Sequence, residues 1–392
     1  MEFSRDRLTW VAYGLLAWFA YLQAAPGLIV GHLRDEFGLS YSTGGLHVAA
    51  FAAGALVAGL ASGPIERAVG RRALFWGSAA LMALGAVGLV AGRAAQATIG
   101  SLFVMGIAGG LLLVTIQALL ADHHGERRAV ALTEANVAAS VAYVVLIGAL
   151  SLAAAAGAGW RAAVLAALAV PALAWWFNRR LAIATPAQQA TADGRRRLPA
   201  AFWVAATMLF CTTAVEWCIT AWGASFVEDA ANVSADAAVS VMIGYFGGVV
   251  AGRVAGSGLA RRHSVHRLLA LALVISAVGF AILWSSASSL QALLGLALLG
   301  VGIGNLFPLG LSVTVALAPD QAQQASGKAV FMTSFAVLLA PLTVGTLADA
   351  TSLTAALAVV PVAAHASATG LTIVTRTAKR EAVLAGGFDL VE

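Results

Sequence analysis

Long apolar stretches alternate with short polar segments along the whole chain. A helix rises about 1.5 Å per residue and needs about 20 mostly apolar residues to cross the hydrocarbon core of a bilayer. The pattern therefore predicts twelve membrane-spanning helices, at residues 8–33, 43–63, 73–92, 99–121, 129–156, 160–178, 200–227, 236–256, 266–285, 290–317, 328–348 and 353–375. Because twelve is an even number, both termini are expected on the same side of the membrane.

The composition agrees with a surface that faces lipid. Hydrophobic residues make up 60% of the 392 residues and charged residues only 10%, and the mean hydropathy is +0.88. A soluble domain carries about 25% charged residues. The net charge is +5, but the basic residues fall in short clusters between apolar stretches. This distribution is typical of membrane proteins, so we expect the lipid bilayer as a partner and no nucleic acid.

The basic residues also predict the orientation of the chain. Of the 23 Lys and Arg residues, 19 lie on the N-terminal side of the predicted membrane. The other side has only Arg34, Arg93 and Arg161, and Arg253 lies within a span. Since Lys and Arg collect in cytoplasmic loops, both termini are expected in the cytoplasm. We expect a multi-pass protein of the bacterial cytoplasmic (inner) membrane.

The longest polar segment, at 178–199, divides the chain into six spans and six spans. It predicts an N-terminal bundle at 1–178, a cytoplasmic linker at 179–199, a C-terminal bundle at 200–375 and a cytoplasmic tail at 376–392. A shift of 194 residues sets Phe51 and Gly54 over Tyr245 and Gly248, which indicates parallel repeats. The predicted fold is an all-α membrane protein of two six-helix pseudo-repeat bundles.

The turn after the second predicted span carries a recognisable motif, Gly63-Pro64-Ile65-Glu66-Arg67-Ala68-Val69-Gly70-Arg71-Arg72. It resembles the turn G-x-L-a-D-R-x-G-R-R of the major facilitator superfamily. Further matches are Gly159-Trp160-Arg161, Gly302-x-Gly304-Asn305-Leu306-Phe307-Pro308 and Pro341-x-x-x-Gly345-x-x-x-Asp349. The resemblance implies solute transport by alternating access, with the first, fourth, seventh and tenth helices around a central cavity.

The resemblance also implies a charge lock at the cytoplasmic side. Arg71 would pair with Asp122 at the end of the fourth helix, on a turn shaped by Gly63 and Gly70. The aspartate position of the family's motif holds Arg67, and the acid stands one residue earlier, at Glu66. One residue is about 100° of helical rotation, so Glu66 need not make the same contact.

Glu216 lies about 16 residues into the seventh span, roughly 24 Å from its start. An ionisable group at that depth is costly and therefore indicates function. The resemblance places its helix beside the cavity, so Glu216 is the candidate for proton coupling or for binding a cation. The alternative is a carboxylate that is hydrogen-bonded between helices.

Other polar and aromatic groups within the spans are candidates for substrate binding, each with a structural alternative. Trp217 and Trp222 could stack on a substrate or anchor the helix at the membrane interface. Asn305 could contact substrate or join two helices, and Gln23 is assigned to substrate. Arg253 is expected to extend to the interface, with anion binding as the alternative.

If Glu216 is not the proton-coupling residue, two further groups are candidates. His47 begins the second span near the outer face, which would suit a gate, and Glu134 opens the fifth span.

The sequence predicts neither an enzyme nor a cofactor or metal site. The run Asp122-His123-His124-Gly125-Glu126 resembles a metal site, but adjacent histidines point to different faces of a helix. A P-loop is not found in the sequence. Any uphill transport is therefore expected to draw on an ion gradient.

The expected function is secondary active transport of a small organic solute, in a proton-coupled form, by a monomer. Export of amphipathic or cationic compounds is one version, but Met105 and Ala108 stand where proton-coupled drug exporters carry Arg and Gln. Uptake of a small organic anion or facilitated diffusion without protons is the alternative. A receptor or scaffold without transport is a third class, and would show a soluble domain or an interaction tail.

Overall fold

The computed structural model describes residues 4–183 and 197–384, and their regular structure is helical throughout. The first half contains α1 (Arg7–Phe37), α2 (Tyr41–Val69), α3 (Arg71–Ala91), α4 (Ala95–His124), α5 (Arg128–Ala155), α6 (Gly159–Ala166) and α7 (Ala169–Asn178). The second half contains α8 (Ala200–Ala231), α9 (Ala235–Val241), α10 (Ile243–Leu259), α11 (Val265–Trp284), α12 (Ser289–Ala316), α13 (Ala322–Ala350), α14 (Leu353–Ala356) and α15 (Val359–Leu384).

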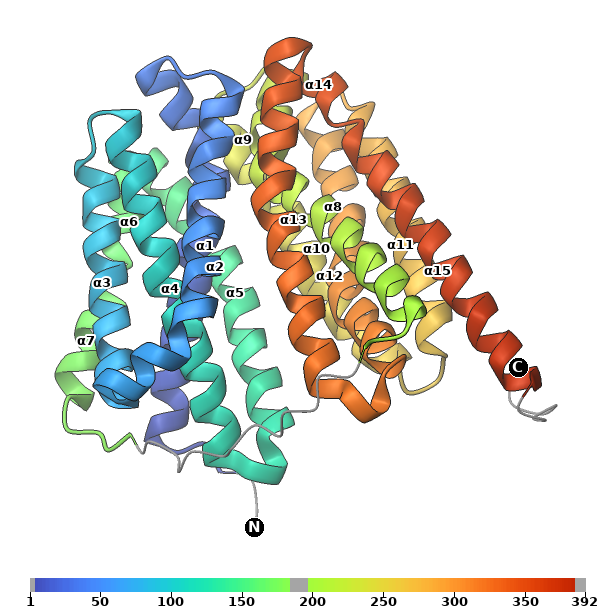
Figure 1. Ribbon diagram of the computed structural model, residues 1–392. Helices are drawn as coiled ribbons and strands as arrows, with labels where there is room; N and C mark the ends of the chain where they lie inside the picture. The colour runs from blue at the N-terminus through green and yellow to red at the C-terminus, as the bar shows by residue number, and fades with distance from the viewer. Residues whose placement is uncertain (1–3, 184–196, 385–392) are drawn as a thin grey trace.

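These helices cross a membrane-sized thickness twelve times, as the sequence predicts. Eleven helical stretches of the described residues are long and apolar enough to span a bilayer. One of them, Ala95–Ala155, has 61 residues and contains both α4 and α5, which run in opposite directions around a single 3-10 turn, Gly125–Arg127 (Figure 1). The all-α, twelve-span prediction is thus confirmed.

Three of the predicted spans are each broken into two helices, where the sequence predicts continuous ones. The chain breaks between α6 and α7 at Ala167–Leu168, between α9 and α10 at Met242, and between α14 and α15 at Leu357–Ala358. At the first and third breaks a proline lies three or four residues further on, Pro171 and Pro361. A proline has no N–H to donate and its ring crowds the carbonyl four residues earlier, so the helix is interrupted there.

Helices within each half approach closely at glycines. A side chain on Gly54 of α2 would overlap the backbone of α4, and one on Gly252 of α10 would overlap the Val301 carbonyl of α12. Small residues at such positions let two backbones pack together in a membrane. The close contact of α10 with α12 fixes the face that α10 presents to the first half.

Helix α1 begins and α15 ends at the same face of the molecule, the lower side of Figure 1, which we call the terminal face. The two halves are joined near the other face, which we call the opposite face. Near the opposite face, the Asp349 carboxylate accepts hydrogen bonds from the backbone N–H groups of Tyr41 and Ser42, at 2.7 and 2.9 Å. The Tyr41 hydroxyl donates to Asp229 at 2.9 Å. Toward the terminal face the ribbons of the two halves separate (Figure 1).

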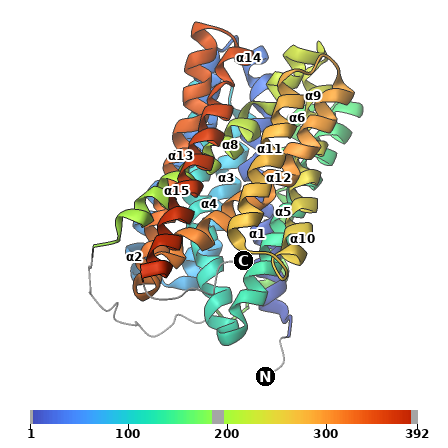
Figure 2. The same ribbon diagram turned by 90° about the vertical axis from the view of Figure 1, so that its right-hand side faces the viewer.

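Other pairs strengthen the same junction. His32 of α1 bonds to Asp236 of α9 at 2.8 Å, and Ser151 of α5 bonds to Ser240 at 2.8 Å. Figure 2 shows the two edges of the interface, with α5 beside α10 on one side and α2 beside α13 on the other. The halves therefore meet along two helix pairs, with α1 and α8 between them.

The predicted linker lies mostly outside the described residues, and so does much of the predicted tail. The first residues assigned to the tail continue α15 as far as Leu384.

Candidate functional site

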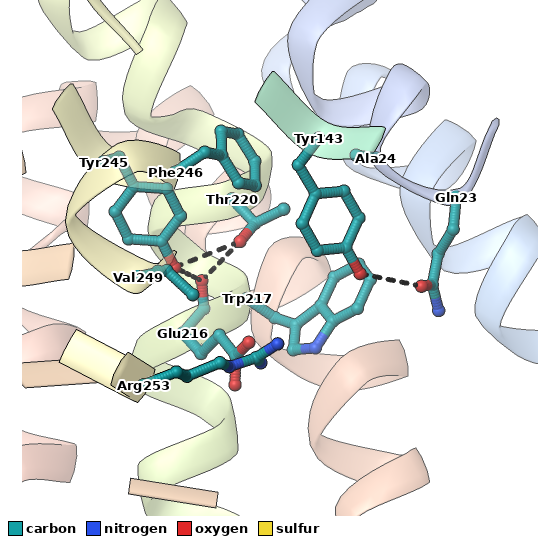
Figure 3. Close-up of a pocket in the computed structure, with 10 residues that line it drawn as sticks. All are labelled: Gln23, Ala24, Tyr143, Glu216, Trp217, Thr220, Tyr245, Phe246, Val249 and Arg253. Carbon is teal, nitrogen blue, oxygen red and sulfur yellow. Dashed lines mark hydrogen bonds between the residues drawn. The ribbon is translucent and has the colours of Figure 1, made fainter. Parts of the chain in front are cut away.

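A narrow cavity lies between the two halves at mid-depth, with a volume of about 20 Å³. This is room for about one water molecule, so a larger ligand enters only if the halves move apart. Its walls come from α1, α5, α8 and α10 (Figure 3). The lining residues are Gln23, Ala24, Tyr143, Glu216, Trp217, Thr220, Tyr245, Phe246, Val249 and Arg253.

The first half contributes uncharged polar groups. The Tyr143 hydroxyl of α5 donates to the side-chain oxygen of Gln23 in α1 at 3.3 Å. The Tyr143 ring also packs across the interface against Phe246 of α10, with 5.2 Å between ring centroids. Gln23 and Tyr143 therefore form a neutral wall that can offer hydrogen bonds to a ligand.

Glu216 projects from α8 into the cavity (Figure 3). Its backbone carbonyl accepts hydrogen bonds from Thr220, at 2.9 Å, and from the Tyr245 hydroxyl, at 3.3 Å. These bonds fix the turn of α8 that carries the side chain. No hydrogen bond or ion pair joins its carboxylate to another described residue. The carboxylate is thus available to a proton or a ligand.

Arg253 projects from α10 into the same cavity instead of extending to the membrane interface. Its Nη1 donates to the Ser140 hydroxyl of α5, and its Nε donates to the Gly304 carbonyl at 3.4 Å. Asn305 helps to set this arrangement, because its side-chain amide donates to the Gly252 carbonyl of α10 at 2.7 Å. Neutral oxygens therefore hold Arg253 at the interface between the two halves, and its bond to Ser140 links them.

The Arg253–Ser140 bond lies on the terminal side of the cavity. Helix α10 runs from the opposite face toward the terminal face, so Arg253 is roughly 10 Å nearer the terminal face than Phe246. The Tyr143–Phe246 ring pair covers the cavity on the opposite side. Among the described residues, the Arg253–Ser140 hydrogen bond crosses the interface on the terminal side of the cavity, whereas several bonds join the halves on the other side.

Comparison with known proteins identifies the fold. The sequence profile of the Major Facilitator Superfamily matches residues 9–262. The chain belongs to the major facilitator superfamily. No curated protein sequence matches it significantly.

Solved structures of superfamily transporters share the fold at low sequence identity. A D-xylose–proton symporter is 16% identical, with a TM-score of 0.79 over 94% of this chain and 96% of its own. The nucleoside transporter NupG is 12% identical, with a TM-score of 0.72 over 95% and 98%. A bacterial homolog of the human lysosomal transporter Spinster, inward-facing and occupied, is 13% identical, with a TM-score of 0.74 over 96% and 98%.

The facilitator motif after the second span brings three charged groups together. Arg71 is buried, and it bonds to Glu66 through Nε at 2.7 Å and to Asp122 through Nη1 at 2.6 Å. Arg67 is exposed on the other side of the turn. Gly70 has a φ of 79°, so it supplies the left-handed turn between α2 and α3. Gly63 lies one helical turn before Arg67, with its α-carbon facing that side chain.

The other proposed ligand contacts lie in different places. Gln23 and Trp217 line the cavity, beside Glu216. Trp222 is fully buried near the opposite face, where its indole N–H donates to the Pro341 carbonyl at 2.9 Å and its ring packs against Tyr41. Asn305 joins α10 and α12. The cavity thus gathers three of the five residues proposed for substrate or proton.

The remaining candidates lie away from the cavity. His47 is buried between the Thr43 carbonyl and the Thr98 hydroxyl, each at 2.9 Å. Glu134 receives two bonds from Arg5 and one from Tyr13 near the terminal face. Within the described part of the chain, no cluster of three His, Cys, Asp or Glu side chains could hold a metal ion.

Sequence reasoning did not select Tyr143, Tyr245, Thr220 or Ser140. A usable signal was present, because Tyr143 and Tyr245 are polar aromatic residues near the middle of largely apolar spans. The resemblance directed attention to the fourth and tenth predicted spans. The cavity is instead lined by the fifth span, which is α5, and by the part of the eighth span that forms α10.

Proposed function

We propose that this facilitator is a proton-coupled secondary transporter that moves a small organic solute across the bacterial cytoplasmic membrane by alternating access. The observation that carries the proposal is the cavity between the halves, with the Glu216 carboxylate facing it and bonded to no other described residue. A transporter of this kind binds substrate near the membrane midplane and rocks its two halves around the site.

The arrangement of contacts supports alternating access. Bonds of Tyr41, Asp349, His32 and Ser151 hold the halves together near the opposite face, while the interface below the cavity is crossed by the Arg253–Ser140 bond. We take the terminal face as cytoplasmic because the sequence predicts 19 of the 23 basic residues on that side. In this orientation the molecule is closed to the outside and closer to opening inward.

Glu216 is the residue we assign to proton coupling. An ionisable group within a membrane is costly unless it is used, and it usually marks a proton or substrate pathway. Glu216 interacts electrostatically with Arg253 across the cavity. A proton on the carboxylate therefore changes the charge that Arg253 and a ligand experience. The proton symporter among the structural relatives supports this chemistry in the fold.

The test begins with a ligand, since a solute that binds the folded protein raises its unfolding temperature. A diverse solute library is screened in this way, and the best ligand is assayed in proteoliposomes. We expect its accumulation to depend on an imposed pH gradient. Glu216→Gln keeps the size and hydrogen bonding of the side chain but cannot titrate, so it should lose gradient-driven accumulation. Glu126→Gln, at an exposed turn, is the matched control. Full accumulation by Glu216→Gln would remove the residue from the mechanism.

A second candidate, uptake of an organic anion without protons, is favoured by Arg253 in the same cavity. It predicts transport that is unaffected by the pH gradient and abolished by Arg253→Gln. A receptor without transport would bind the ligand yet show no flux of it, whether a pH gradient or a gradient of the ligand is imposed.

A further inference from the structure

The cavity holds one negative and one positive side chain, and both come from the second half. Glu216 is on α8 and Arg253 is on α10, and the other eight lining residues are uncharged. The formal charge of the lining is therefore balanced when both groups are ionised. A ligand that carries a net charge would upset this balance.

The two charged groups do not neutralise each other by direct contact. They interact electrostatically, but no Glu216 oxygen lies within 4.0 Å of an Arg253 nitrogen. Among the described residues Arg253 bonds only to the neutral oxygens of Ser140 and Gly304, and the carboxylate of Glu216 bonds to none. Both residues are only partly exposed, and a charge within a membrane span without an opposite charge in contact is unfavourable. Each group is thus left to be satisfied by a ligand group of opposite sign.

We propose that the substrate is a small ampholyte with an amine and a carboxylate a few ångströms apart, as in a single amino acid. The inference rests on the proposed transport function and names its substrate class. The ammonium group pairs with Glu216, and the carboxylate pairs with the guanidinium of Arg253, whose planar fork matches a carboxylate in two parallel bonds. A ligand with one charge pairs with one of these side chains and leaves the other without a charged partner.

The remaining walls fit the rest of such a molecule. Trp217 stands beside Glu216, where its ring can stabilise an ammonium group. Tyr143 and Phe246 offer an apolar surface to a side chain, and Gln23 and Tyr143 offer neutral hydrogen bonds.

The test uses purified full-length protein and measures ligand affinity from thermal unfolding, without any gradient. The panel contains the twenty common amino acids, β-alanine, γ-aminobutyrate and glycine betaine. For the best binder, two derivatives are compared with it: the methyl ester, which keeps the amine, and the deaminated acid, which keeps the carboxylate. We expect the parent compound to bind about tenfold or more tightly than either derivative, because each derivative leaves one charged group of the cavity unpaired.

Charge-removing variants should change the preference in opposite directions. In Glu216→Gln the deaminated acid should equal or exceed the parent, and in Arg253→Gln the methyl ester should do so. The exposed residues Glu126 and Arg93 provide the controls Glu126→Gln and Arg93→Gln, which should keep the wild-type order.

The inference is overturned if no member of the panel binds, or if a singly charged derivative binds as tightly as its parent. In either case pH-driven transport of another ligand that still depends on Glu216 would leave the proposed function standing. Conversely, binding of an ampholyte with the expected variant pattern but no flux would preserve the substrate class and overturn the transport function.

Discussion

Tyr143, which is half-buried, and Tyr21, which is buried, carry hydroxyl groups with different expected roles. Tyr143 donates to Gln23 inside the cavity, whereas Tyr21 donates to the Ala163 carbonyl away from it, at 2.9 Å. A single hydrogen bond contributes about 1 kcal/mol. Tyr143→Phe should therefore weaken ligand binding several-fold with little change in unfolding temperature. Tyr21→Phe should lower the stability by about 1 kcal/mol and leave the dissociation constant unchanged.

Thermal unfolding with and without ligand measures both quantities for each variant. Equal affinities for wild type and Tyr143→Phe would exclude a ligand contact at this hydroxyl.

At the residue scale, the sequence identified the charged residues within the spans, but not the direction of their side chains or their bonding partners. The cost of an ionisable group in a membrane picked out Glu216 directly. Arg253 was expected at the interface, because its depth in the span does not reveal which way its side chain turns. The contact of α10 with α12 at Gly252 settles that direction. The sequence also made Asn305 and Trp222 candidates for substrate binding, yet each of them bonds to the backbone of a neighbouring helix.

At the scale of helices, the junction between α2, α3 and α4 yields the next prediction. Arg71 bonds to both Glu66 and Asp122, so each acid holds part of the same buried guanidinium. Removal of Arg71 leaves both acids without their partner. Arg71→Ala and Asp122→Asn should each impair transport, and the double variant should lose less than the sum, since both remove one interaction.

Transport rates of the four proteins in this cycle measure the coupling. Glu66→Gln in the same background shows how much of the lock the second acid retains. Strict additivity of the Arg71 and Asp122 effects would argue against a shared lock.

The contact of α13 with the start of α2 predicts a change of conformation. The Asp349 carboxylate accepts the first free N–H groups of α2, where a negative charge is stabilised by the helix dipole. Asp349→Asn removes this charge and weakens the junction at the opposite face. Spin labels at Arg93→Cys and Ala287→Cys, on the two halves, should then move apart, in a background without Cys211 and Cys218.

The matched control is Asp320→Asn, at the other end of α13, where the side chain is exposed. An unchanged distance distribution in Asp349→Asn would show that this carboxylate does not hold the face closed.

Helix positions were largely predictable, and helix continuity was not. The twelve apolar stretches coincide with the twelve crossings, because hydropathy alone requires them. Most helices continue past the predicted ends, as α1 does from Leu33 to Phe37, since polar residues near the surface still complete helical turns. The breaks near Pro171 and Pro361 follow from proline chemistry, yet a proline does not always break a helix, since Pro26 lies inside the unbroken α1.

At the scale of the whole molecule, the two halves depend on contacts that no local pattern reveals. Asp349 and Tyr41 are 308 residues apart, and Ser140 and Arg253 are 113 residues apart. The division at the polar segment and the shared repeat favoured two bundles. The sequence did not reveal which face holds the bundles together, because that depends on a conformational equilibrium between halves of similar design.

This equilibrium and the orientation together predict which side reaches the cavity. Arg262 lies at the terminal face and Arg93 at the opposite face, both exposed. If the terminal face is cytoplasmic, a cysteine at Arg262 should be labelled by an impermeant reagent only from the cytoplasm, and a cysteine at Arg93 only from outside. A cysteine at Val249, in the cavity, should react mainly from the cytoplasmic side, because the junction of Tyr41 with Asp349 closes the other side. Adding Asp349→Asn should increase its labelling from outside. Reversed labelling of Arg262 and Arg93 would overturn the orientation, whereas correct labelling there with a Val249 cysteine that reacts only from outside would overturn the inward-facing assignment alone.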